Sequence, residues 1–99
     1  RGLAQSCAGT GVTVNAVLPG PTRSEGVVDF FGKLAADSGI ALDEMERRFF
    51  AEGRPSSILK RMIDPAEVAA LVAYVCSARA AATTGAALRV EGGIVSTIC

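Results

Sequence analysis

Apolar residues at helical spacing predict one helix in the second half of the chain. The segment Asp-Pro-Ala-Glu at 64–67 places an N-cap residue, a proline at the first helical position and a glutamate suited to a capping box. We therefore predict an amphipathic helix over residues 65–78, with its apolar side buried. The residues on that side, at i, i+3, i+4, i+7 and i+8, are Val68, Leu71, Val72, Val75 and Cys76.

Two short apolar runs predict strands. Residues 12–18 are β-branched or apolar at both odd and even positions, which is typical of a strand covered on both faces. Pro19-Gly20-Pro21 ends this run sharply. A second run, residues 86–90, is closed by Glu-Gly-Gly. Because helical segments separate the two runs, we expect a βαβ crossover with parallel pairing.

The first part of the chain predicts the end of one helix and the whole of another. Residues 1–8 carry helix formers and are stopped by Gly-Thr-Gly, as at the tail of a longer helix. Ser24 is placed to cap a helix running from Glu25 toward Asp37, and Gly39 is placed as its C-terminal residue.

A further helix is predicted to open at Asp43, which has capping-box spacing from Glu46, and to run to Gly53. Residues 55–62 show no period and are predicted as loop. The charges on the helix form two i,i+4 pairs, which favours a solvated face over an acid/base site. These pairs are Asp43 with Arg47 and Glu44 with Arg48.

Composition narrows the classes of function. Ten Lys plus Arg balance ten Asp plus Glu in 99 residues, so the chain has no basic surplus for nucleic acid or an anionic membrane. It has no histidine, which removes Ser-His-Asp and Cys-His catalysis and His-ligated metals. Three cysteines without C-x-x-C spacing predict no metal cage and a reducing, cytoplasmic location.

The hydrophobic content is 49% and the mean hydropathy is +0.37, values that argue against disorder. No apolar run approaches the length of a membrane span. Two strands and three helices do not easily cover both faces of a parallel sheet. We therefore expect one domain at most, and a chain that is part of a larger α/β sheet.

The stretch at the end of the first strand is the candidate for chemistry. In open α/β sheets, ligands bind beyond the carboxyl ends of the strands. A glycine there permits close backbone approach, prolines stiffen the turn, and a serine hydroxyl stands beside a helix N-terminus. These residues form a plausible seat for the polar parts of a dinucleotide. The candidate cofactor-binding residues are Pro19, Gly20, Pro21, Thr22 and Ser24.

At this point the sequence resembles the short-chain dehydrogenase/reductase family. That family has an Asn-x-x-x-Pro-Gly-x-x-x-Thr pattern at the end of its sixth strand, matched here by Asn15, Pro19, Gly20 and Ser24. Its Arg…Pro-Glu-Glu-Val-Ala…Thr-Gly…Val-Asp-Gly-Gly ending is matched as well. The matching residues are Arg61, Asp-Pro-Ala-Glu-Val-Ala at 64–69, Thr84-Gly85 and Val-Glu-Gly-Gly at 90–93.

The resemblance implies an α/β fold, the C-terminal part of a Rossmann-type doubly wound parallel sheet. It implies an NAD- or NADP-dependent oxidoreductase that transfers a hydride between the cofactor and a carbonyl or alcohol substrate. Residues 19–62 would form the cofactor loop and substrate lid, with Val27, Phe30 and Phe31 lining an apolar pocket. It also implies a homo-oligomer that packs through helix 65–78 and strand 86–90.

Two parts of the family pattern are missing from this sequence. Gly9-Thr10-Gly11 precedes a strand, so it does not fit the Gly-rich phosphate turn. The Tyr-x-x-x-Lys pair is absent, because the single tyrosine, Tyr74, is followed four residues later by Ala78. We therefore assign no catalytic and no metal residue, and expect the chain to be inactive alone. The alternative is a non-catalytic α/β remnant or interaction module that completes a partner's sheet.

Overall fold

A computed structural model describes residues 1–98, which fall into two compact units. The sheet unit consists of Arg1–Pro19 and Ala66–Val90. The helical unit consists of residues 20–65 together with those from Glu91 onward. Each unit has its own internal packing and is described by itself.

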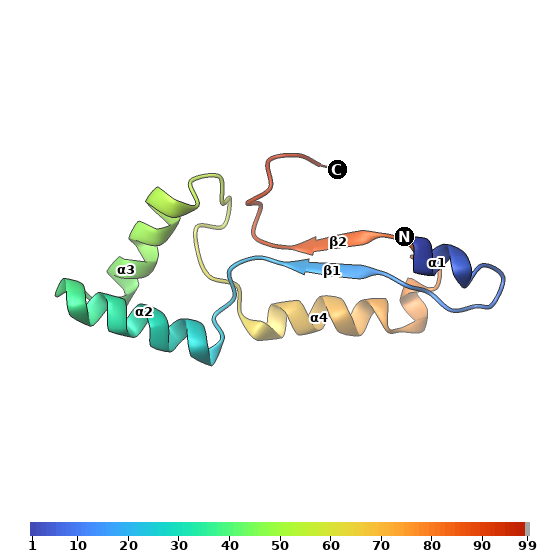
Figure 1. Ribbon diagram of the computed structural model, residues 1–99, viewed down its shortest axis with the longest axis horizontal. Coiled ribbons are helices and arrows are strands. Elements are labelled where there is room, and N and C mark those ends of the chain that lie inside the picture. Colours follow the sequence, from blue (N-terminus) through green and yellow to red (C-terminus); the bar gives the residue numbers. More distant parts are fainter. Residues whose placement is uncertain (99) are drawn as a thin grey trace. The chain divides into compact units, whose positions relative to one another are not determined.

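The sheet unit contains a parallel pair of strands, β1 (Ala16–Pro19) and β2 (Ala87–Val90), in register from Ala16↔Ala87 to Pro19↔Val90. Helix α4 (Pro65–Val75) lies along one side of the strands and runs opposite to them (Figure 1). This arrangement confirms the predicted βαβ crossover and parallel pairing.

The first residues form a short helix, α1 (Gly2–Ser6), shorter than the predicted range 1–8. Gly9 and Gly11 adopt φ of 76° and 80°, left-handed values that stop the helix as expected. A single 3-10 turn, η2 (Ala78–Ala80), follows α4, so the helix predicted over 65–78 ends at Val75.

Strand β1 begins four residues later than the predicted run at Val12. A strand needs a partner, and β2 offers only four residues for ladder pairing. Upstream of β1 the chain is joined to residues before β2 by separate hydrogen bonds. The N–H of Gly85 donates to the Val14 carbonyl at 2.7 Å, and the Val14 N–H donates to Thr84 Oγ1 at 3.1 Å.

Within residues 1–98, the apolar side chains of the strands and of α4 are not buried as predicted. Leu18 in β1 is 43% exposed, and α4 has no buried residue. Cys76, predicted to be a buried hydrophobe, is exposed. Only α4 lies alongside the two strands in the sheet unit, so the apolar side chains lack the second layer that the sequence pattern implies.

The helical unit is built around α2 (Glu25–Ser38) and α3 (Leu42–Arg48). Ser24 caps α2 as predicted, because its Oγ accepts a hydrogen bond from the Val27 N–H at 3.4 Å. Gly39 ends the helix with a left-handed φ of 67°. The two helices pack around a small core composed of Phe31, Ala35, Met45, Phe50 and Met62.

The predicted start of α3 at Asp43 is wrong. The helix begins at Leu42 after Ala41, and no side chain caps it. Asp43 lies inside the first turn, where its Oδ1 accepts from the Glu44 N–H at 2.9 Å. After α3 the chain continues as a π-helical segment, η1 (Phe49–Gly53), which turns the Phe50 ring into the core with 1% exposure.

Residues 55–62 contain no regular helix or strand, as predicted. Next to them, Ile63 forms an isolated parallel bridge with Thr22. The N–H groups of Ile58 and Leu59 both donate to the Gly92 carbonyl, at 2.9 and 3.1 Å. This loop is therefore held to the turn that follows β2. Within residues 1–98 no helix is both long and apolar enough to cross a membrane.

Candidate functional site

The turn after β1 is shaped by a close backbone approach. A Cβ built on Gly20 would lie 2.7 Å from the Cα of Glu91 and 2.8 Å from its carbonyl oxygen. Real Cβ atoms do not approach backbone so closely, so only glycine fits. The sequence predicted that Gly20 permits such an approach, and the structure shows that the approaching segment is the Glu-Gly-Gly turn of the chain itself.

Hydrogen bonds hold the rest of the turn. The Ile63 N–H donates to the Pro21 carbonyl at 2.9 Å, and the Arg23 N–H donates to the Ile63 carbonyl at 2.8 Å. The Thr22 hydroxyl donates to the Gly20 carbonyl at 2.9 Å. Among residues 1–98, the backbone N–H of Thr22 forms no hydrogen bond. The turn is thus held by hydrogen bonds and retains a backbone donor at Thr22 for an external acceptor.

Ser24 caps α2, and its hydroxyl can still donate one hydrogen bond. Its Oγ accepts from the Val27 N–H, which leaves the hydroxyl proton to donate elsewhere. The side chain is exposed at the N-terminus of α2, a helix of 14 residues. A helix start of this kind favours an acceptor or a negative charge nearby.

Glu91, which stands where the family has aspartate, acts within the chain. Its carboxylate accepts hydrogen bonds from the backbone N–H of Ile94 and, at 3.2 Å, from that of Val95. It therefore organises the turn that packs against Gly20. The sequence alone did not predict these contacts, because the partners of the Glu91 carboxylate depend on how the turn folds.

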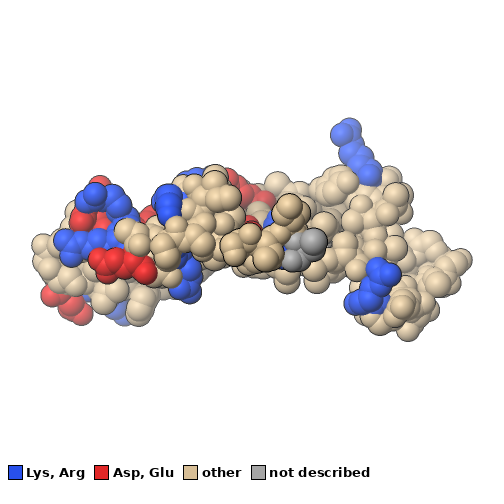
Figure 2. Space-filling view, turned by 90° about the horizontal axis from the view of Figure 1, so that it is seen from above, with Lys and Arg blue, Asp and Glu red and all other residues tan. Residues whose placement is uncertain are grey.

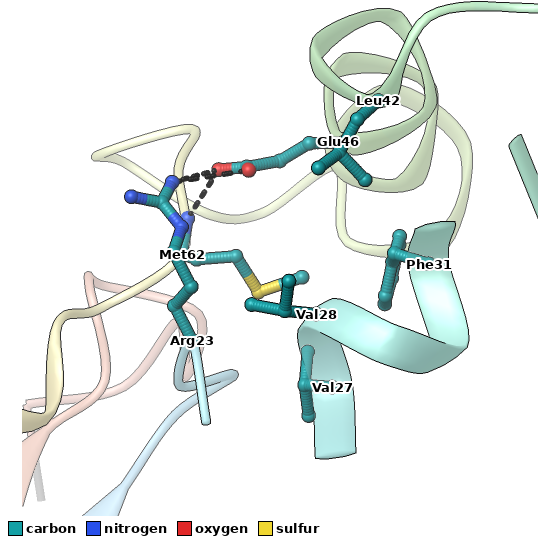
Figure 3. A pocket seen from close by; sticks show the side chains of 7 residues that line it. All are labelled: Arg23, Val27, Val28, Phe31, Leu42, Glu46 and Met62. Atoms are coloured by element: carbon teal, nitrogen blue, oxygen red, sulfur yellow. Dashed lines mark hydrogen bonds and ion pairs between the residues drawn. The ribbon is translucent and has the colours of Figure 1, made fainter. Parts of the chain in front are cut away.

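An apolar cavity of about 100 Å³ opens between α2 and α3 (Figure 3). Of the three predicted pocket residues, Val27 and Phe31 line it, whereas Phe30 does not and is 61% exposed. Phe30 and Phe31 are neighbours in a helix and so point in different directions. The full lining consists of Arg23, Val27, Val28, Phe31, Leu42, Glu46 and Met62.

An ion pair that the sequence did not predict stands at this cavity. Nη2 of Arg23 donates to both oxygens of Glu46, at 3.0 and 3.1 Å, as the dashed lines of Figure 3 mark. The same carboxylate accepts from the Met62 N–H at 2.9 Å. These partners lie 23 and 16 residues from Glu46 in sequence, so no local spacing rule detects them.

On the solvent face of α3, Glu44 binds Arg47 through an ion pair and Arg48 at 2.9 Å. Hydrogen bonds from the two guanidinium groups lower the pKa of Glu44. Glu44 thus takes the partner that had been predicted for Asp43. Figure 2 shows positive and negative side chains interleaved over the end of the molecule that holds α2 and α3, as expected for a solvated face.

Asn15, the first residue of the strand-end pattern, is used for structure. Its Nδ2 donates to the Thr83 carbonyl at 2.9 Å, and its Oδ1 accepts from the Ala86 N–H at 3.2 Å. One amide therefore joins the chain before β1 to the chain before β2. Within residues 1–98 no cluster of three or more His, Cys, Asp or Glu residues is placed to hold a metal.

Comparison with known proteins gives the same family as the motifs. The family described as enoyl-(acyl carrier protein) reductase matches residues 1–95. The chain is 43% identical over 98 residues to the uncharacterized oxidoreductase YvaG of Bacillus subtilis, covering 99% of this chain. It is 38% identical over 93 residues to the A-factor type gamma-butyrolactone 1'-reductase (1S-forming) of Streptomyces virginiae, covering 94% of this chain and 32% of that protein.

Among solved structures, the L-sorbose reductase of Gluconobacter frateurii, complexed with NADPH and L-sorbose, superposes with a TM-score of 0.85 at 26% identity. The match covers 98% of this chain and 36% of that one. The chain spans 37% of the length of the YvaG oxidoreductase. The matched part corresponds to the C-terminal portion of such proteins, which agrees with the predicted fold class.

Proposed function

Because the chain belongs to the short-chain dehydrogenase/reductase family, we propose that it is the C-terminal part of an NAD(P)-dependent oxidoreductase acting on a carbonyl or alcohol. The nicotinamide cofactor, when bound, supplies or accepts the hydride at the carbon of that substrate. The observation that carries the proposal is the strand-end turn, which follows the carboxyl end of β1, is held by hydrogen bonds and keeps the Thr22 N–H unpaired.

The turn fits the nicotinamide end of a dinucleotide. The unpaired N–H of Thr22 suits a carboxamide or phosphate oxygen, and the Ser24 hydroxyl adds a side-chain donor. Pro19 and Pro21 restrict the backbone, so little conformational entropy is lost when the ligand is ordered. These five residues form the cofactor side of the proposed site, for either NAD or NADP.

We assign the substrate-binding side of the site to the cavity beside α2. Val27 and Phe31 line this apolar cavity, and Phe30, exposed on the same helix, is available to contact substrate outside the cavity. In the family, the tyrosine of Tyr-x-x-x-Lys transfers the proton to or from the substrate oxygen. Residues 1–99 hold no such pair. We therefore infer that this chain is inactive by itself and acts as one part of a complete domain.

A homo-oligomer is part of the proposal. Helix α4 has no buried residue, and Val72 and Tyr74 are 41% and 46% exposed. Apolar surface of this kind is used in subunit interfaces. We propose that residues 65–78 and 86–90 pack against a second copy. The cytoplasmic location expected from the cysteine pattern stays a prediction.

The first experiment is to read the coding frame upstream of Arg1 and express the full-length protein. We expect a Tyr-x-x-x-Lys just ahead of Arg1 and a Gly-rich strand-to-helix turn further upstream. The purified protein is then titrated with NADH and NADPH, and cofactor oxidation is followed with a panel of ketones and aldehydes. Binding of one cofactor with turnover of a carbonyl supports the proposal.

The 99-residue chain alone is the matched control, and we expect neither turnover nor tight cofactor binding from it. A full-length protein that binds neither cofactor contradicts the proposal. A coding frame without the catalytic pair favours the interaction module, whose open β1 edge would complete a partner's sheet.

A further inference from the structure

The lining of the cavity between α2 and α3 is mostly apolar. Val27, Val28, Phe31, Leu42 and Met62 present only apolar atoms to it, from two helices and the segment before α4 (Figure 3). The only charged side chains in the lining are Arg23 and Glu46. Such a cavity binds hydrocarbon, because a water molecule inside it would lack hydrogen-bonding partners.

The volume of the cavity, about 100 Å³, limits what it holds. An apolar protein cavity of about 150 Å³ accommodates benzene, a molecule of six carbons. On that scale, this cavity suits a group of about four carbon atoms. A short alkyl or acyl chain fits, whereas a fused ring system or a long fatty chain does not.

The positive charge at the cavity is paired with carboxylates. Arg23 donates to both oxygens of Glu46, at 3.0 and 3.1 Å, and its Nη1 lies 3.4 Å from Oδ1 of Asp64. An incoming carboxylate or phosphate would have to displace the Glu46 carboxylate from Arg23 and would meet the like charge of that carboxylate.

Glu46 is held in this position from a second direction. Its Oε1 also accepts from the Met62 N–H at 2.9 Å, and its side chain is 21% exposed. A carboxylate with donors on both sides is fixed in its rotamer and reorients only by losing both contacts. Glu46 is thus a fixed part of the cavity wall.

We propose that this cavity receives an uncharged apolar substituent of the substrate, about four carbons long, and that Glu46 excludes anionic substrates by neutralising Arg23. The inference rests on the proposed oxidoreductase function and names the substrate class of the same site. The substrate is thus a neutral ketone, aldehyde or secondary alcohol with a short alkyl arm. In the reaction, hydride adds to the carbonyl carbon and a proton to its oxygen, or the reverse.

The first test is a series of methyl ketones with unbranched arms of two to eight carbons, assayed with the full-length protein and its cofactor. We expect kcat/KM to rise by about tenfold or more per methylene until the arm fills the cavity, and then to level off near four carbons. A kcat/KM that does not depend on arm length overturns the inference while leaving the oxidoreductase function intact.

The second test changes the charge. Glu46→Gln keeps the shape of the side chain but leaves Arg23 with a positive charge at the cavity. We expect kcat/KM for a keto acid, relative to a neutral ketone of equal length, to rise on the order of tenfold, as for one added charge-assisted hydrogen bond. Glu44→Gln, the same change on the solvent face of α3, is the control and leaves the ratio unchanged. An unchanged ratio in Glu46→Gln refutes the charge filter.

A binding measurement separates this inference from the proposed function. The chain has two methionines, of which Met62 lines the cavity and Met45 lies in the core without lining it. In full-length protein labelled at the methionine methyl groups, 1-butanol should shift the Met62 methyl resonance more than that of Met45, and butyrate should not. Equal effects of the two probes, or none, overturn the inference even if the protein turns over no carbonyl.

Discussion

The space that a side chain would occupy at Gly20 is filled by the backbone of Glu91. The two residues are 71 positions apart, yet a Cβ on Gly20 would come within 2.7 Å of the Glu91 Cα. Both belong to motifs found in the sequence, the Pro-Gly turn after the first strand and the Glu-Gly-Gly turn after the second. Their contact couples the two turns, because the backbone of one leaves room only for glycine in the other.

Replacing Gly20 with alanine is expected to destabilise the protein. The added methyl group meets backbone atoms, which move less readily than a side chain, so the overpacking costs about 1–3 kcal/mol. Gly26→Ala is the matched control, since nothing lies within 4 Å of its Cβ position inside α2. There we expect a gain of about 0.5–1 kcal/mol. Urea denaturation measures both, and equal stability of the two variants would contradict the close approach.

Removing the side-chain amide of Asn15 is expected to loosen the sheet unit. Asn15→Ala leaves the Thr83 carbonyl and the Ala86 N–H without their partner, at a cost of about 1–3 kcal/mol for each group that water does not reach. Asn15→Asp retains the acceptor but loses the donor, and should fall between alanine and wild type. Hydrogen exchange of the Ala86 amide is the direct readout. Protection that persists in the alanine variant would show that the amide bridge contributes nothing.

Ser24 is expected to affect both stability and cofactor binding. Ser24→Ala removes the cap of α2, worth about 0.5–2 kcal/mol, and the proposed hydrogen bond to the cofactor. Loss of that bond raises the cofactor KM roughly two- to tenfold. Ser24→Thr keeps the hydroxyl and should restore both. A lower stability with an unchanged KM would mean that Ser24 acts only as a helix cap.

The pH dependence of α3 follows from Glu44. Its pKa is lowered by hydrogen bonds from Arg47 and Arg48, so the folded state binds this proton less readily than the unfolded state. The stabilisation is therefore fully present above the ordinary carboxyl pKa and is lost as pH falls through the lowered value. Because the group is exposed, we expect a small effect that high salt weakens. A carboxyl-carbon NMR titration should give a midpoint for Glu44 below the ordinary value. A midpoint at or above that value would contradict the ion pairs.

Local signals succeeded where the interacting groups are neighbours in sequence. Ser24 and Gly39 cap α2 as predicted, because an N-cap contacts an amide three residues away and a left-handed C-terminal residue needs only glycine. The same kind of local rule gave a wrong helix start at Asp43. Its spacing from Glu46 suits a capping box, but Glu46 turns toward Arg23 and Met62, and the helix starts one residue earlier. Both partners of Glu46 are distant in sequence, so the local spacing did not reveal them.

The sequence by itself determined the order of elements, the parallel pairing, the strand-end turn and the family, because these depend on local periodicity and on short motifs. Only the tertiary structure decided what the polar groups contact and how far the strands extend. Strand β1 is limited by the four residues of its partner, and Phe31 faces the cavity while Phe30 does not. The Arg23–Glu46 pair joins residues 23 positions apart. Such contacts form only when folding brings distant segments together, so no spacing along the chain encodes them.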